Sequence, residues 1–316
     1  MKFTTIAAAA ALALTAGAAA AETRVTYKSA KTGTSYYQMG VEIAEAVKAA
    51  TGGEIIVTVE ESQGSVQNVM ETRARGADYV FTTPPALVGA AQGAKGPFDG
   101  KGDPKFDEIR ALFPIPSLTM HFVMSAESGA TDIAGLEGKT ILLGKGSFGA
   151  TEGAKYIELF GLAGKVTEAD AELSNAVAAL KNGQIDGFVT AGSWPAPNVT
   201  EAAASMDVRV LSLSDEEVAA TRRAKLVIPA GTYAGQDAPI TTTSLPVVAY
   251  ATTAMSDDAA YALTKAFWEK REAMAAAAPW WAGVDSGLMA NIAGKVHPGA
   301  ARYYKEIGWA LTEAQM

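Results

Sequence analysis

Residues 55–85 read IIVTVEESQGSVQNVMETRARGADYVFTTPP, and this stretch decides the fold. The β-branched run at 55–59 predicts a strand, 64–75 predicts a helix, and 79–81 predicts a second strand that runs into hydroxyl residues and prolines. The helix between the two strands supplies the long crossover that parallel pairing requires. We therefore expect these strands to lie parallel in one sheet. The sequence therefore predicts an α/β fold with helices on the faces of a parallel or mixed sheet.

The same alternation extends in both directions along the chain. A short strand at 25–27 and a helix after the loop 33–37 precede the quoted stretch, and a second series of strands and helices occupies 140–189. Two long extended runs, 112–124 and 241–252, connect the two series. We therefore predict two lobes: lobe I comprises 22–122 and 243–316, lobe II comprises 123–242, and hinge strands lie near 118–124 and 245–251.

The first 21 residues, MKFTTIAAAAALALTAGAAAA, have the layout of a cleavable signal peptide. Lys2 precedes an apolar run, and three alanines precede the polar Glu22. The apolar run is too short for a stable membrane span. A signal peptide on a 316-residue chain that contains no cysteine suggests export to a bacterial periplasm, where the fold must be stable through its core alone.

The composition excludes several classes of function. A net charge of −8 argues against a nucleic-acid partner, which would favour a basic face. Without cysteine there is no thiolate nucleophile and no cysteine-ligated zinc. The two histidines, His121 and His297, lie far apart and lack a metal-binding motif. We expect no catalytic residues, no metal and no cofactor, and a monomeric protein.

A glycine-rich loop, GKGSFG at 144–149, leaves one enzymatic alternative open. It follows a predicted strand and precedes a predicted helix, and Asp170 lies downstream, as in a dinucleotide-binding fingerprint. That pattern would suit an NAD-dependent oxidoreductase. The same loop would also place free N–H groups of a helix N-terminus beside a bound carboxylate. In a third interpretation the glycines serve only the turn.

Five polar loops follow predicted strands, and in an open parallel sheet such loops gather at one edge, where ligands bind. Their hydroxyls and backbone amides suit a small anionic or zwitterionic solute, although any single Ser or Thr could serve only as a helix cap. The candidate ligand-binding residues are Ser35, Tyr36, Tyr37, Gln63, Ser65, Thr82, Thr83, Ser147, Phe148, Thr151, Thr190, Ala191 and Gly192.

A succession of short motifs along the chain resembles the TAXI family of solute receptors for TRAP transporters. These motifs are GTSYY at 33–37, GSVQN at 64–68, NGQID at 182–186 with TAG at 190–192, IPAGTY at 228–233, and HPGA at 297–300 with RYY at 302–304. The resemblance implies a two-lobe periplasmic binding-protein fold, type II-like, that closes on solute in a cleft between the lobes. It also implies delivery of glutamate, glutamine or a related C5 dicarboxylate to a TRAP membrane permease. A receptor that feeds a signalling partner is an alternative use of the same fold.

Overall fold

The computed structural model describes residues 23–316. The predicted signal peptide, 1–21, lies outside the described residues. Ten strands form one continuous sheet with the order β2-β1-β3-β10-β4-β7-β5-β6, while β8 pairs with β4 and β9 pairs with β10. The predicted mixed α/β fold is confirmed.

The strands and helices alternate along most of the chain. The strands are β1 (Thr23–Lys28), β2 (Ile55–Glu60), β3 (Tyr79–Thr83), β4 (Ile109–Ser125), β5 (Thr140–Leu142), β6 (Thr167–Ala169), β7 (Gly187–Gly192), β8 (Val208–Val210), β9 (Ala224–Ile228) and β10 (Ile240–Thr252). The α-helices are α1 (Ser35–Ala50), α2 (Ser65–Glu71), α3 (Pro85–Gln92), α4 (Phe148–Leu159), α5 (Ala176–Lys181), α6 (Pro197–Ser205), α7 (Asp215–Thr221), α8 (Asp257–Ala277) and α9 (Pro298–Glu306).

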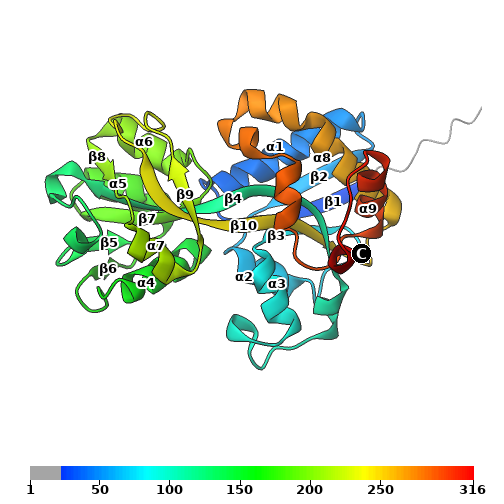
Figure 1. Ribbon diagram of the computed structural model, residues 1–316, viewed down its shortest axis with the longest axis horizontal. Helices are drawn as coiled ribbons and strands as arrows, with labels where there is room; N and C mark the ends of the chain where they lie inside the picture. The colour runs from blue at the N-terminus through cyan, green and yellow to red at the C-terminus, as the bar shows by residue number, and fades with distance from the viewer. Residues whose placement is uncertain (1–22) are drawn as a thin grey trace, which may run out of the picture.

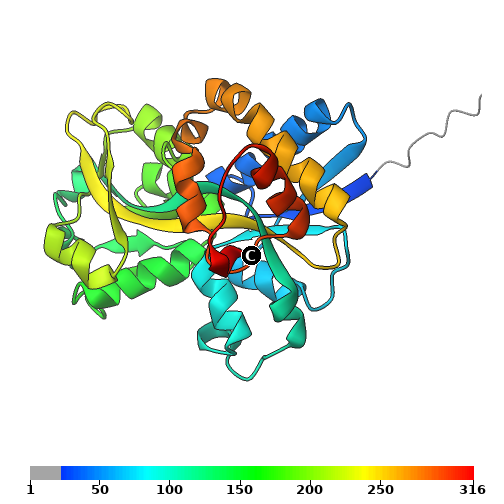
Figure 2. The same ribbon diagram turned by 45° about the vertical axis from the view of Figure 1, so that its right-hand side comes forward.

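Two groups of elements flank the long strands β4 and β10 (Figure 1). Lobe I holds β1–β3 with α1–α3, α8 and α9, and lobe II holds β5–β9 with α4–α7 (Figure 1). Within lobe I, β1 pairs in parallel with β2 and β3, and within lobe II, β5 pairs in parallel with β6 and β7. The C-terminal helices return to the N-terminal lobe, as the turned view also shows (Figure 2).

The two crossing strands are antiparallel partners of each other. Near one end β10 also pairs with β3, and at the other end β4 pairs with β7 and β10 with β9. β4 continues through both Pro114 and Pro116. Register irregularities occur between Leu245 and Val247 and between Ala249 and Tyr250. The first shift coincides with Pro116 and Pro246, which cannot donate a ladder hydrogen bond, whereas Leu112 lies opposite the second.

The loops 33–37 and 82–83 were predicted to follow their strands as coil. Instead, α1 begins at Ser35, because the Thr34 hydroxyl caps it by accepting a hydrogen bond from the Tyr37 N–H at 3.3 Å. Thr82 and Thr83 belong to β3, where their backbones face Ala249 and Val248 of β10. Pairing with β10 thus extends β3 into the residues 82–83 that were predicted as a loop.

Two further boundaries differ from prediction, one through strand pairing and one through a local side-chain hydrogen bond. The loop predicted from Thr190 is part of β7, because β4 is long enough to pair Thr119 with Gly192. The helix predicted for 64–75 ends at Glu71. There the Thr72 hydroxyl donates to the Val69 carbonyl at 2.8 Å and competes with the continuing helix.

Candidate functional site

A cavity of about 50 Å³ lies where lobe I, lobe II and both crossing strands meet. This volume is enough for a few waters or part of a small solute. The loop after β1, the starts of α1 and α2 and the end of β3 form one side, and the start of α4 and the end of β7 form the other. The lining residues are Ser29, Ala30, Lys31, Thr34, Tyr36, Gln63, Gly64, Ser65, Thr82, Leu118, Ser147, Phe148, Gly149, Leu173, Ala191 and Val247.

Three helices begin at the cavity wall. Their N-cap residues are Thr34 for α1, Gly64 for α2 and Ser147 for α4, and all three line the cavity. The Ser147 hydroxyl accepts a hydrogen bond from the Ala150 N–H at 3.0 Å, which leaves other first-turn N–H groups for a ligand. Because the N-terminal end of a helix carries partial positive charge, this convergence favours an anionic group in the cavity.

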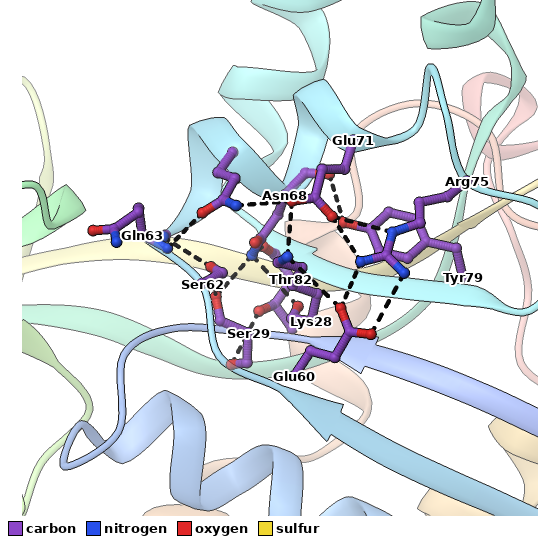
Figure 3. Close-up of polar contacts among 12 residues, drawn as sticks. Lys28, Ser29, Glu60, Ser62, Gln63, Asn68, Glu71, Arg75, Tyr79 and Thr82 are labelled. Carbon is purple, nitrogen blue, oxygen red and sulfur yellow. Dashed lines mark hydrogen bonds and ion pairs between the residues drawn. The ribbon is translucent and has the colours of Figure 1, made fainter.

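A buried amide holds the lobe I wall in place (Figure 3). The Asn68 side-chain NH2 group donates to the carbonyl of Ser29 at 2.7 Å and to that of Thr82 at 2.8 Å. The Ser62 hydroxyl donates to the Ser29 carbonyl at 3.1 Å and accepts from the Gly64 N–H at 2.8 Å. Asn68 therefore ties α2 to the ends of β1 and β3, so that the polar groups of this wall are positioned before any solute arrives.

A cluster of four charged side chains lies beside this amide (Figure 3). The Lys28 ammonium contacts Glu71 at 2.8 Å, and the Arg75 guanidinium contacts Glu60 at 2.5 Å and Glu71 at 3.0 Å. Burial raises the pKa of Glu71, but hydrogen bonds from Lys28, Arg75 and Gln67 outweigh it, and the pKa lies below its usual range. The cluster fixes α2 against the sheet.

The structure brings about half of the predicted residues together at the cavity. Those that line it are Tyr36, Gln63, Ser65, Thr82, Ser147, Phe148 and Ala191. Six others lie outside the lining: Ser35, Tyr37, Thr83, Thr151, Thr190 and Gly192. The whole set remains a proposal for ligand binding.

Among these six, two meet each other across the lobes. The buried Ser35 hydroxyl accepts a hydrogen bond from the Ser193 N–H at 3.0 Å, and a Cβ on Gly192 would lie 2.6 Å from the Ser35 oxygen. Thr83 and Thr190 are buried in their strands, whereas Thr151 is exposed on α4. Ser35 and Gly192 therefore belong to a contact between the two groups of elements.

Six lining residues fall outside the predicted loops: Ser29, Ala30, Lys31, Leu118, Leu173 and Val247. The first three directly follow β1, so the rule that ligands bind at the carboxyl ends of strands would have found them. Leu118 and Val247 come from the crossing strands and form the apolar floor. Leu173 follows β6, a strand that the sequence pattern did not reveal.

The glycine-rich loop has little room for a dinucleotide. A Cβ on Gly146 would lie 3.0 Å from the Gln63 side-chain oxygen, and one on Gly149 would lie 3.2 Å from the Ala191 backbone nitrogen. The glycines thus allow lobe I and β7 to approach the loop. Asp170, the candidate ribose ligand, pairs with Lys145 at 2.9 Å. This packing favours the anion-binding and turn interpretations.

A family model described as NMT1-like matches residues 28–308. The chain belongs to the NMT1-like family. This family member is similar to a solved structure from Bordetella bronchiseptica RB50, at 18% identity and a TM-score of 0.51, with 92% of this chain and 86% of that one covered. The periplasmic binding protein BugD shows 12% identity and a TM-score of 0.51, with 91% and 87% covered. MatC from Rhodopseudomonas palustris, with bound malate, shows 13% identity and a TM-score of 0.52, with 79% and 85% covered.

These likenesses give the NMT1-like chain the two-lobe fold of periplasmic solute-binding proteins, as predicted. The expectation of a binding protein rather than an enzyme agrees with this fold, which the chain shares with the periplasmic binding protein BugD. None of the described helices combines the length and apolarity needed to cross a membrane. Within residues 23–316, no three acidic or histidine side chains are grouped as metal ligands.

Proposed function

We propose that the protein is an extracytoplasmic solute receptor of a TAXI-type TRAP transporter. In this role it binds a small carboxylate or amino acid, such as glutamate, glutamine or a C5 dicarboxylate, and delivers it to the membrane permease. The observation that carries the proposal is the cavity between the lobes, where helices α1, α2 and α4 begin among hydroxyl side chains. The signal peptide at 1–21 would direct the chain to the periplasm, where it would act as a monomer.

Hydrogen bonds from hydroxyl and backbone N–H groups to a carboxylate are strong enough for a transport receptor. Three or four bonds to a carboxylate contribute about 1.5–3 kcal/mol each. Helix N-termini add about 1 kcal/mol, and the sum supports micromolar affinity, which corresponds to about −8 kcal/mol. We propose that lobe I (22–122 and 243–316) and lobe II (123–242) close on the solute by bending near 118–124 and 245–251. The closed state would then be the form that the permease recognises.

Titration calorimetry with L-glutamate, L-glutamine, 2-oxoglutarate and malate tests the ligand class. We expect at least one of these acids to bind with micromolar affinity and to raise the melting temperature, because a ligand that binds only the folded state stabilises it. Absence of both heat and thermal shift with all four would refute the proposed ligand class. Solute transport by a TRAP permease whose genes lie beside the receptor gene, reconstituted together with the receptor, then tests the TRAP assignment.

A further inference from the structure

Lys31 lies on the boundary between the inner cavity and a larger outer one. It follows β1, lines the cavity of about 50 Å³, and also lines a second cavity of about 280 Å³, called the outer one because exposed residues such as Glu61 and Glu172 line it. Its side chain is only 13% exposed. Any solute that enters the inner cavity from the outer one therefore passes this ammonium group.

The Lys31 ammonium is held by groups from the opposite lobe. It forms an ion pair with Glu172, which lies between β6 and α5, and donates to the carbonyl of Lys145 at 3.5 Å. Both partners belong to lobe II, whereas Lys31 belongs to lobe I. Movement of the lobes away from each other would separate these charges, so the pair would be specific to a closed cleft.

Lys31 also supplies the charge of the inner cavity. Of the described residues that line this cavity, Lys31 alone carries a charged side chain. The other polar groups there are hydroxyls, an amide and backbone N–H groups, which accept neutral and anionic solutes alike. An ammonium group in a partly buried site discriminates by charge, because screening by water is reduced there.

We propose that Lys31 determines specificity for an anionic solute and couples that charge to closure of the lobes, while Glu172 positions Lys31 across the cleft. This inference rests on the proposed binding function. The solute's anionic group lies on the cavity side of the ammonium, and the Glu172 carboxylate lies on its outer side. A negatively charged solute is thereby held most strongly in the closed state.

The first test compares L-glutamate with L-glutamine, which are alike in size and differ in one charge. We expect Lys31→Met to reduce the preference for L-glutamate over L-glutamine about tenfold. Lys165→Met removes a similar ammonium from an exposed pair with Glu137 within lobe II, and should leave the preference unchanged. An unchanged preference in the Lys31 variant would overturn the inference even if both acids bind.

The second test measures lobe closure without solute. Because the chain has no native cysteine, spin labels at Ala49→Cys on α1 and Glu158→Cys on α4 report the distance between the lobes. We expect Lys31→Met and Glu172→Gln to shift the distances towards longer values, and Lys165→Met to leave them unchanged. Label distances that do not respond to the Lys31 or Glu172 changes would overturn the cross-cleft ion pair.

The double variant Lys31→Glu with Glu172→Lys exchanges the two charges. It distinguishes the role of Lys31 in lobe closure from its role in contacting the solute. We expect it to restore the short label distance, because opposite charges again face each other, but not the preference for L-glutamate, because the ammonium has left the inner cavity. Recovery of both properties would refute a solute contact by Lys31. Wild-type protein that binds neither of these acids, nor 2-oxoglutarate or malate, would refute the proposed function and the solute contact, while the label distances still decide the ion pair.

Discussion

The Asn68 amide offers the sharpest test of how the lobe I wall is built. Asn68→Leu keeps the number and branching of the side-chain heavy atoms, although the methyl groups are larger, and removes both hydrogen bonds of ordinary length, to the carbonyls of Ser29 and Thr82. The Ser29 carbonyl keeps a second donor, the Ser62 hydroxyl, whereas the Thr82 carbonyl loses its side-chain donor. The change also removes the Asn68 side-chain oxygen, which is buried without a hydrogen-bond partner among the described residues.

These contacts set the expected magnitude. Each lost hydrogen bond contributes about 1 kcal/mol, and a carbonyl left buried without its donor costs about 1–3 kcal/mol. Loss of the unpaired oxygen offsets part of this cost. We therefore expect Asn68→Leu to lower the free energy of unfolding by about 2–3 kcal/mol. Asn68→Asp should cost more, because a carboxylate would face the same carbonyl oxygens without any donor.

Urea unfolding followed by circular dichroism measures this difference, with the slope of the transition compared between variants. Asn175→Leu is the matched control, because Asn175 is exposed and its side chain makes no capping bond to α5. The control should lie within about 0.5 kcal/mol of wild type. An equally small change in Asn68→Leu would show that the amide does not hold the wall together, and our account of the preformed site would be wrong.

Three further predictions concern other parts of the molecule. Burial lowers the pKa of His121 to about 4, below the ordinary value of 6.5, so the unfolded chain binds the proton first. Stability should therefore fall by up to about 3 kcal/mol between pH 6.5 and pH 4, and His121→Gln should flatten this fall in urea titrations. Ser147→Ala removes the cap of α4 and should cost about 1 kcal/mol in melting experiments, in addition to weaker solute binding in calorimetry. Gly187→Ala would place a Cβ 2.2 Å from the Met124 sulfur and should cost at least about 1–3 kcal/mol by the same unfolding assay. A wild-type-like midpoint in either of the last two variants, or a pH profile unchanged by His121→Gln, would contradict its account.

Strongly patterned segments made most of the fold predictable. The β-branched run at 55–59 and the extended runs at 112–124 and 241–252 each correspond to a strand. Shorter strands carried too little signal: Thr167–Ala169 is three residues long and contains a glutamate, and Ala224–Ile228 is half exposed because it pairs at the edge with β10. Their existence depends on a partner strand and not on local propensity.

The site was predictable where it follows a strand end and unpredictable where it depends on distant contacts. Gln63 and Ser147 could be proposed because each lies just beyond a predicted strand. Lys31 follows a strand end, but its ion-pair partner, Glu172, comes from the other lobe, and no local pattern indicates that pairing. Ser35 could be proposed from its loop, but its contact with Ser193 follows from how the lobes close.

The central place of β10 in the sheet has a consequence for synthesis of the chain. β10 lies between β3 and β4, so the strands of lobe I cannot be joined to β4 until residues 240–252 have left the ribosome. Until then β3 and β4 each present an unpaired edge, which is prone to pair with other chains. Nascent chains stopped before residue 240 should therefore remain protease-sensitive and bind chaperones, whereas those that extend past residue 252 should begin to resist cleavage.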